Sequence, residues 1–281
     1  SSTASLTIRG DDLEYNDLAF GFSNSLDSTG GMVMESHSNS FSSAFDYENF
    51  DLDPSVSSVR IGKTTNTANV VIKDPVAMAG PISIYGGDIL LEEDLTSTLS
   101  GADVLVKGRG DVEAVASRSF LTNNGDIVFW SNSDNSGVGS IKLGNDNVLN
   151  SSNGRSGDTD SGGGKITLGG GSGYGTSPTG YSSSSTGAGI KLGTSTANHT
   201  EIYSGGGDIS IKGSSTATGL VDDRDESGIY QWGRMTMKSG RGAITMLGTS
   251  SEYQGIGFVA PVSESDVCLL YTSPSPRDGR E

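Results

Sequence analysis

The sequence predicts an all-β protein, and more specifically a parallel β-helix, in which short strands coil into a column around a thin core. Three observations favour this fold. Short runs of alternating apolar residues recur along the chain at intervals of roughly 15–25 residues. Glycine precedes most of these runs, and the chain contains 42 glycines. Hydrophobic residues make up only 33% of the 281 residues, which is too few for a compact domain with a deep core.

The repeat unit is a glycine, a small or polar residue, a β-branched residue, a variable residue and an apolar residue. Residues 123–143 contain two copies joined by a small polar linker. Alternation with a period of two is typical of strands with one buried face. Glycine reaches positive φ at no steric cost and Asp or Asn can bond its own backbone, so we expect these residues to set sharp corners. The unit recurs at Gly87–Leu91, Gly110–Val112, Gly164–Leu168, Gly189–Leu192, Gly207–Ile211 and Gly242–Met246.

The regularity of this pattern divides the chain. Residues 1–58 alternate loosely, and we expect irregular leading solenoid turns with a polar insertion around residues 36–54. Residues 59–267 are predicted to form the regular parallel β-helix. Long polar stretches interrupt this part, and we expect them to project from one face as contact surfaces. These stretches cover residues 150–163, 169–187 and 216–228.

The C-terminal end differs from the rest in character. Cys268–Asp278 match one reading frame of a translated transposase sequencing adapter, so we expect residues 268–281 to be a non-native tail. Cys268 is the only cysteine, and without it the chain offers no evidence of its redox compartment. The chain begins at Ser1 without a signal peptide. We therefore expect a fragment of a longer protein, with both ends of the column open and prone to aggregation.

The charge of the chain excludes several partner classes. The formal net charge is −16, and the sequence pI is about 4.4. A polyanion of this size repels phosphate backbones and anionic lipid, so we expect no nucleic-acid partner. No run approaches the roughly 20 apolar residues of a membrane span, so we expect no membrane insertion.

Four stretches carry a likeness to a known family. They are Pro81–Ile89, Thr122–Ser131, Gly162–Leu168 and Ser204–Ile211. In these stretches the chain resembles the filamentous-haemagglutinin-type β-helical surface proteins, and above all the very long β-strand-repeat proteins of gliding and marine bacteria. The resemblance covers most of residues 59–262 and implies a right-handed helix, secretion to the bacterial cell surface, and a role in adhesion or matrix building.

The candidate catalytic groups form no convincing site. His37 and His199 lie far apart and have no cysteine partner, which argues against a zinc site or a Ser-His-Asp triad. Gly62–Thr64 is similar to the end of a phosphate-binding loop, but Ser57 stands where that motif needs a glycine. Asp222–Glu226 is an acidic cluster of the kind used in glycoside hydrolysis, although it lies in a predicted loop. We predict no catalytic residues, with a carbohydrate-active β-helix enzyme, a polysaccharide lyase or hydrolase, as the alternative.

Calcium is the most plausible cation for this chain. Asn132–Gly137 and Asp158–Asp160 supply the clustered oxygen ligands that hard cations require. However, Leu143 stands where an EF-hand loop would close with a carboxylate. We predict solvated turns without metal or cofactor, and keep a calcium-stiffened extracellular spacer as a second alternative.

Aromatic and threonine residues could form binding surfaces if they face outward. Trp130 follows Phe129 in an alternating run, so one of the two points inward and the other outward. An ice-binding face needs stacked Thr-x-Thr ladders, but the segments 96–98, 194–196 and 216–218 do not fall at one position of the repeat. Core filling and edge packing are favoured over a carbohydrate platform for Trp130, Tyr174, Tyr181, Tyr203, Tyr230 and Trp232.

The resemblance implies a non-catalytic structural or adhesive segment of a long secreted bacterial cell-surface protein, and no motif in the sequence points to catalysis. Its extended surface and loops would contact a host or environmental surface, through carbohydrate or protein. The ligand itself is not encoded in any motif of the sequence.

Overall fold

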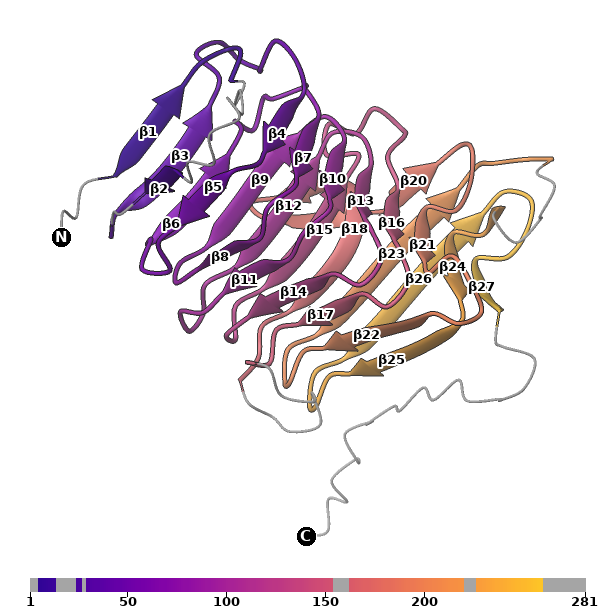
Figure 1. Ribbon diagram of the computed structural model, residues 1–281. Helices are drawn as coiled ribbons and strands as arrows, with labels where there is room; N and C mark the ends of the chain where they lie inside the picture. The colour runs from indigo at the N-terminus through magenta and orange to yellow at the C-terminus, as the bar shows by residue number, and fades with distance from the viewer. Residues whose placement is uncertain (1–4, 14–23, 27–28, 154–161, 220–225, 260–281) are drawn as a thin grey trace, which may run out of the picture.

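The computed structural model describes residues 5–13, 24–26, 29–153, 162–219 and 226–259, and these form a column of stacked short strands (Figure 1). No α-helix occurs among the described residues, so the all-β prediction is confirmed. Three sheets of parallel-stacked strands run along the column, and from residue 58 onward each coil adds one strand to the first sheet and then to the others. This is the arrangement of a parallel β-helix, with β1 (Leu6–Arg9) and β26 (Ile244–Ser250) at opposite ends.

The first sheet contains eleven strands within the described residues. Nine of them stack coil upon coil; the other two are β19 (Ser177–Gly180), in an antiparallel hairpin, and β20 (Ser182–Ser184), in parallel with a strand of a later coil. The strands are β1 (Leu6–Arg9), β3 (Gly31–Glu35), β6 (Ser58–Ile61), β9 (Ile82–Gly86), β12 (Val104–Gly108), β15 (Ile127–Ser131), β18 (Ile166–Tyr174), β19 (Ser177–Gly180), β20 (Ser182–Ser184), β23 (Ile209–Ser215) and β26 (Ile244–Ser250).

Two further sheets complete the walls of the column. The second sheet consists of β4 (Phe45–Tyr47), β7 (Val70–Ile72), β10 (Ile89–Leu91), β13 (Val112–Ala114), β16 (Ile141–Leu143), β21 (Ile190–Leu192), β24 (Ile229–Trp232) and β27 (Ile256–Val259). The third consists of β8 (Val76–Met78), β11 (Leu95–Ser97), β14 (Ser119–Thr122), β17 (Val148–Asn150), β22 (His199–Tyr203) and β25 (Arg234–Lys238). A separate pair joins β2 (Asn24–Leu26) to β5 (Phe50–Leu52).

The core consists of aliphatic ladders in which like residues stack on like. In the first sheet, Val104 lies in register between Ile82 and Ile127, and all three side chains are fully buried. Inward residues of all three sheets join in one cluster along the column. Each fully buried aliphatic side chain contributes roughly 1.5–3 kcal/mol, so a thin core of few residues per coil suffices.

The leading part of the chain is more regular than expected. Residues 36–54 were predicted to be a polar insertion, but they contain β4 and β5. β4 pairs in register with β7, which places Phe45 beside Val70 and Tyr47 beside Ile72. This stretch is therefore a coil of the column, and the prediction of an insertion is wrong. Aromatic side chains fill the core of this coil, where the ring centroids of Phe41 and Phe45 stack at 4.9 Å.

The glycine that precedes each strand has a different role from the one predicted. Among the repeat-unit glycines, Gly125, Gly164 and Gly207 do not adopt positive φ. A Cβ atom at Gly164 would lie 2.0 Å from the carbonyl oxygen of Gly125, and one at Gly207 would lie 2.1 Å from that of Gly164. Close approach of the adjacent coil therefore excludes any side chain. Left-handed corners lie at other residues, among them Asn124 and Asn132 at φ 63° and 48° and Gly193 at φ 81°.

The Asp residues of the repeat join one coil to the next. Asp103 Oδ1 accepts a hydrogen bond from Asp126 N at 2.7 Å, and Asp126 Oδ1 accepts one from Lys165 N at 2.7 Å. We had expected such side chains to bond their own turn, and this prediction is wrong for these positions. The bonds satisfy backbone N–H groups at the corners between coils. The same bond joins Asn69 to Asp88, Asp88 to Asp111, Asp111 to Ser140 and Asp208 to Ala243.

Residues 169–187 were predicted to be a loop, but much of this stretch is β-structure. β18 extends beyond the first sheet and turns back as β19, to which it pairs in antiparallel fashion. β20 then pairs in parallel with β23. The other two predicted loops, at 150–163 and 216–228, lie partly outside the described residues.

Candidate functional site

A small hydrophobic cluster lies on the outer face of the first sheet, apart from the main core. It consists of Leu105, Val128 and Trp130, with Tyr85 packed against it. Trp130 is 2% exposed, whereas its neighbour Phe129 lies in the main core. The prediction that one of these two residues points inward and the other outward is confirmed. The Lys107 Nζ atom lies 3.6 Å from the centroid of the Trp130 ring, and burial lowers the pKa of Lys107.

The hairpin formed by β18 and β19 covers Trp130. The Trp130 Nε1–H donates a hydrogen bond of 2.8 Å to the carbonyl oxygen of Gly171. Gly173 lies directly on the indole, because a Cβ atom at this position would come within 2.5 Å of the ring. Gly171, at φ 64°, lets the strand turn over the sheet. Trp130 therefore clamps the hairpin to the column.

Further hydrogen bonds hold the returning strand in place. Thr179 Oγ1 donates to the carbonyl oxygen of Ser172 at 3.0 Å, across the hairpin. Lys212 Nζ donates to the carbonyl oxygen of Thr179 at 3.4 Å, from the next coil. Gly175, at φ 63°, begins the two-residue turn between Tyr174 and Ser177. The base of the hairpin is thus fixed at several points.

The tip of the hairpin is open to solvent. Residues 172–177 are all exposed, and the side chain of Tyr174 is 90% exposed. Tyr181, just after β19, is 36% exposed. Residues 166–190 contain no Asp, Glu, Lys, Arg or His, although the chain as a whole has a net charge of −16. The hairpin is therefore an uncharged projection on an acidic column.

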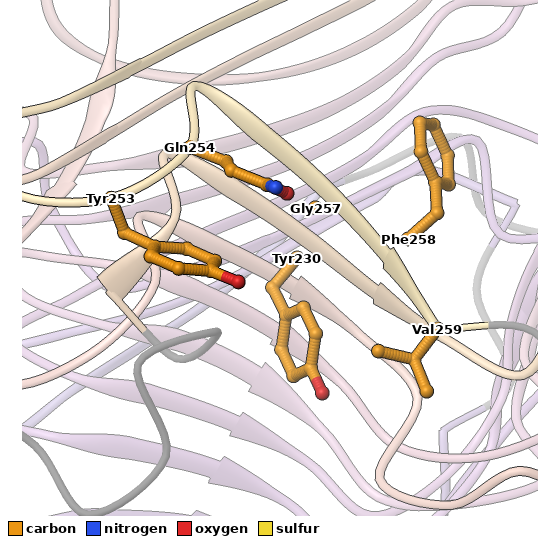
Figure 2. Close-up of a pocket in the computed structure, with 6 residues that line it drawn as sticks. All are labelled: Tyr230, Tyr253, Gln254, Gly257, Phe258 and Val259. Carbon is orange, nitrogen blue, oxygen red and sulfur yellow. The ribbon is translucent and has the colours of Figure 1, made fainter.

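A pocket of about 230 Å³ lies at the last described coil (Figure 2). It is lined by Tyr230 of β24, by Tyr253 and Gln254 in the turn before β27, and by residues 257–259 of β27. Gly257 lies beside Tyr230 in register, and a Cβ atom at Gly257 would lie 3.5 Å from the Tyr230 ring. Tyr253 and Phe258 are about 40% exposed, at 41% and 40%. The pocket is aromatic with one side-chain amide and no charged group in its lining.

The other aromatic candidates pack against the column. Tyr230 is fully buried, and the Lys191 Nζ atom lies 5.5 Å from its ring centroid and 5.8 Å from that of Trp232. The Lys238 Nζ atom lies 5.9 Å from the ring of Tyr203. Tyr174 differs from these residues because nearly all of its side chain faces solvent.

Charged groups on the outer face pair with one another. The Glu35 carboxylate accepts hydrogen bonds from Arg9 Nε and Arg60 Nη2, each at 2.6 Å, and its side chain is 5% exposed. The hydrogen bond from Arg9 is the largest cause of the lowered pKa of Glu35, and the bond from Arg60 lowers the pKa further. Burial of the carboxylate raises the pKa, but by less than the two arginines lower it. Burial raises the pKa of Asp111, but bonds from Lys142 and Ser140 outweigh it and leave the pKa below its ordinary value. These groups are structural ion pairs.

The predicted catalytic candidates do not come together. His37 follows β3 and is exposed, whereas His199 lies on β22 and contacts Thr236 Oγ1 at 2.9 Å. Gly62–Thr64 forms a turn after β6, as expected, and Lys63 Nζ donates to the carbonyl oxygens of residues 37 and 38. Of the acidic cluster 222–226, only Glu226 lies within the described residues, and it is 5% exposed.

The calcium candidates are occupied by internal bonds where the structure describes them. Asn132 Oδ1 accepts a hydrogen bond from Gly137 N, and Asp134 pairs with Arg109 at 3.2 Å. Asp158–Asp160 lie outside the described residues. Within the described ranges, no group of three or more His, Cys, Asp or Glu side chains is placed to bind a metal ion. In the same ranges no helix has the length and apolar character of a membrane span.

The threonine segments lie at unrelated positions, as expected. Thr96–Thr98 include part of β11 in the third sheet, whereas residues 194–196 lie in a turn after β21 and residues 216–218 follow β23. They form no common ladder.

The hairpin clamp was missed by sequence reasoning. Gly171 and Gly173 lack the alternation that marks the other strands, and Trp130 lies 41 residues before its hydrogen-bond partner Gly171. The only signal was a glycine-rich stretch around one tyrosine. No family model, no curated protein and no solved structure matches the chain.

Proposed function

We propose that this chain is a non-catalytic structural and adhesive segment of a secreted bacterial cell-surface protein. The observation that carries the proposal is the combination of a uniform column with an exposed, uncharged hairpin. A stacked column extends reach at little cost in apolar residues, because each coil needs only a few inward side chains. Such an element gives a cell-surface protein length and exposed area.

The outer face supports a passive role. Several of its charged side chains are engaged in ion pairs, such as Arg9–Glu35 and Lys142–Asp111. A polysaccharide hydrolase needs two carboxyl groups flanking a substrate groove. Among the described residues, the pocket at the last coil has no carboxylate in its lining. A carbohydrate-active enzyme is therefore the weaker hypothesis.

Two measurements on the full chain test the proposal. Antibodies raised against the chain should label intact source cells without permeabilisation, because the segment is proposed to lie on the cell surface. Incubation of the chain with a panel of neutral and acidic polysaccharides should produce neither new reducing ends nor unsaturated products. Labelling that requires permeabilisation contradicts the surface location, and cleavage of any polymer contradicts the non-catalytic role.

A further inference from the structure

We infer that the hairpin of residues 170–180 is the adhesive contact of this segment, and that its partner is a neutral polysaccharide. The inference rests on the proposed function and names the site and the ligand class. It stands on three observations: a nearly fully exposed tyrosine, a clamp that fixes the hairpin, and an uncharged stretch in an acidic chain.

The first observation is the exposure of Tyr174. A tyrosine that is 90% exposed contributes nothing to the core, because its ring remains in water. An exposed tyrosine ring presents a large, rigid surface with one hydroxyl group, so it can pack on the apolar face of a sugar ring while its hydroxyl bonds to a sugar hydroxyl. Tyr181 adds a second, partly exposed ring at the base of the hairpin.

The second observation is that the hairpin is held in place before any partner arrives. Trp130 is 2% exposed and donates to Gly171, while Ser172 and Thr179 are bonded across the hairpin. Binding therefore does not require a loop to be ordered, a cost that otherwise reduces affinity. The buried Trp130 cluster has its own hydrophobic packing on the outside of the column, away from the main core.

The third observation is composition. Residues 166–190 consist of Gly, Ser, Thr, Tyr, Pro, Ala, Ile and Leu, and none is charged. Tyrosine with serine and glycine is the composition of antibody binding loops, in which rigid aromatic area is combined with adaptable hydrogen bonding. An acidic column repels acidic polymers, whereas hydroxyl-rich neutral chains meet no such barrier. Neutral polysaccharide fits both properties.

The test uses the full chain and soluble dextran, xyloglucan and galactomannan as probes, with polygalacturonate as the acidic comparator. Binding by affinity electrophoresis should be seen for at least one neutral polymer and should be weaker for polygalacturonate. Tyr174→Ala should weaken that binding at least fivefold, whereas the matched control Tyr253→Ala, also an exposed tyrosine, should leave it within twofold. Both variants should keep the melting temperature of the parent chain.

A second variant separates positioning from contact. Trp130→Phe keeps an aromatic ring in the cluster but removes the donor to Gly171, so Tyr174 remains while the clamp is loosened. We expect weaker polymer binding together with faster proteolysis within residues 172–177. Absence of binding to all three neutral polymers, stronger binding to polygalacturonate, or equal losses in Tyr174→Ala and Tyr253→Ala would overturn the inference. If chain-coated beads still adhere to cell matrix or to a protein film when one of these results is obtained, the proposed adhesive function is retained. Only the proposed binding site or ligand class is then rejected.

Discussion

At the scale of single residues, the Asp side chains at the corners act as acceptors for the next coil. Burial raises the pKa of Asp103, and the negative charge of the Asp126 carboxylate also raises it. The hydrogen bond from Asp126 N lowers this pKa but does not outweigh burial. The carboxylate therefore supplies a needed acceptor at the expense of a partly buried charge. An amide of the same shape supplies the acceptor without the charge.

We predict that Asp103→Asn is at least as stable as the parent at pH 7, while Asp103→Ala loses about 0.5–1.5 kcal/mol with the lost hydrogen bond. The sign follows from linkage. A carboxyl group whose pKa is raised by folding disfavours the folded state as pH rises through that range, and Asn abolishes this dependence. Chemical denaturation at pH 4 and pH 7 measures both effects. Equal losses for Asn and Ala would show that the acceptor is not what matters.

The opposite dependence is expected at Glu35, whose pKa is lowered by folding. Its contribution to stability is present above the unfolded pKa of about 4.3 and is lost as pH falls through the lower folded value. We predict that Glu35→Gln costs about 1–2 kcal/mol at pH 7, because two arginines lose a charged partner, and that the cost disappears at low pH. The exposed Glu252→Gln is the control. A cost that persists unchanged at low pH would contradict the ion-pair explanation.

At the scale of elements, the repeat glycines permit the coils to stack closely. Gly164 lies against the backbone of Gly125, which cannot move aside without breaking the first sheet. We predict that Gly164→Ala destabilises the chain by about 1–3 kcal/mol or more, through overpacking. The matched control is Gly101→Asn, since Gly101 has φ 79° and a Cβ atom at this position would have nothing within 4 Å. Asn tolerates that backbone conformation, so the loss should stay below about 1 kcal/mol. If thermal unfolding shows the reverse order, close approach is not the reason for the repeat glycine.

Much of the fold was predictable because alternation reports directly on a sheet with one buried face. Runs such as Ile82–Ile84 and Val104–Val106 became strands in the expected places. The same signal was present in the acidic segment, where Phe45–Tyr47 alternates, but its charge concealed the strand β4. The close approach at the glycines could not be predicted, because it depends on the stacking of coils and not on the local conformation of each turn.

The hairpin could not be predicted from apolar alternation, for a related physical reason. Its strands are held by backbone pairing and by a side chain from another coil, Trp130, so its own residues need no apolar alternation. Only the tip residue Tyr174 could be named from the sequence, and its exposure came from the structure.

At the scale of the whole molecule, the strands at the C-terminal end of the described column have an open edge. Of the described strands, β26 pairs only with β23, and Leu247 is 43% exposed. In β23, Ile209 N donates a hydrogen bond to the carbonyl oxygen of Ala243 in the next coil. Ile244 and Met246 of β26 are in register with residues 209 and 211, so their N–H groups point in the same direction, away from β23. An edge of this kind is a template for pairing with another chain.

We predict that the chain associates at high concentration and that Met246→Lys suppresses this association. An inward-pointing charge on an edge strand cannot be covered by a second chain without burying it unpaired. The matched control Thr245→Lys adds the same charge on the outward face and should still associate. Light scattering across a concentration series measures the mean mass of the particles in solution, which rises when chains associate. A parent chain that stays monodisperse, or two lysine variants that behave alike, would contradict this account of the edge.

The central claim is that the column adheres passively, and the most direct measurement is the detachment force of chain-coated beads from a neutral polysaccharide film, followed over hours. We predict a force well above that of albumin-coated beads that stays constant with time, with no soluble fragments released from the film. A force no greater than that of the albumin beads on this film and also on cell matrix and a protein film, or a force that decays as fragments appear, would contradict the claim.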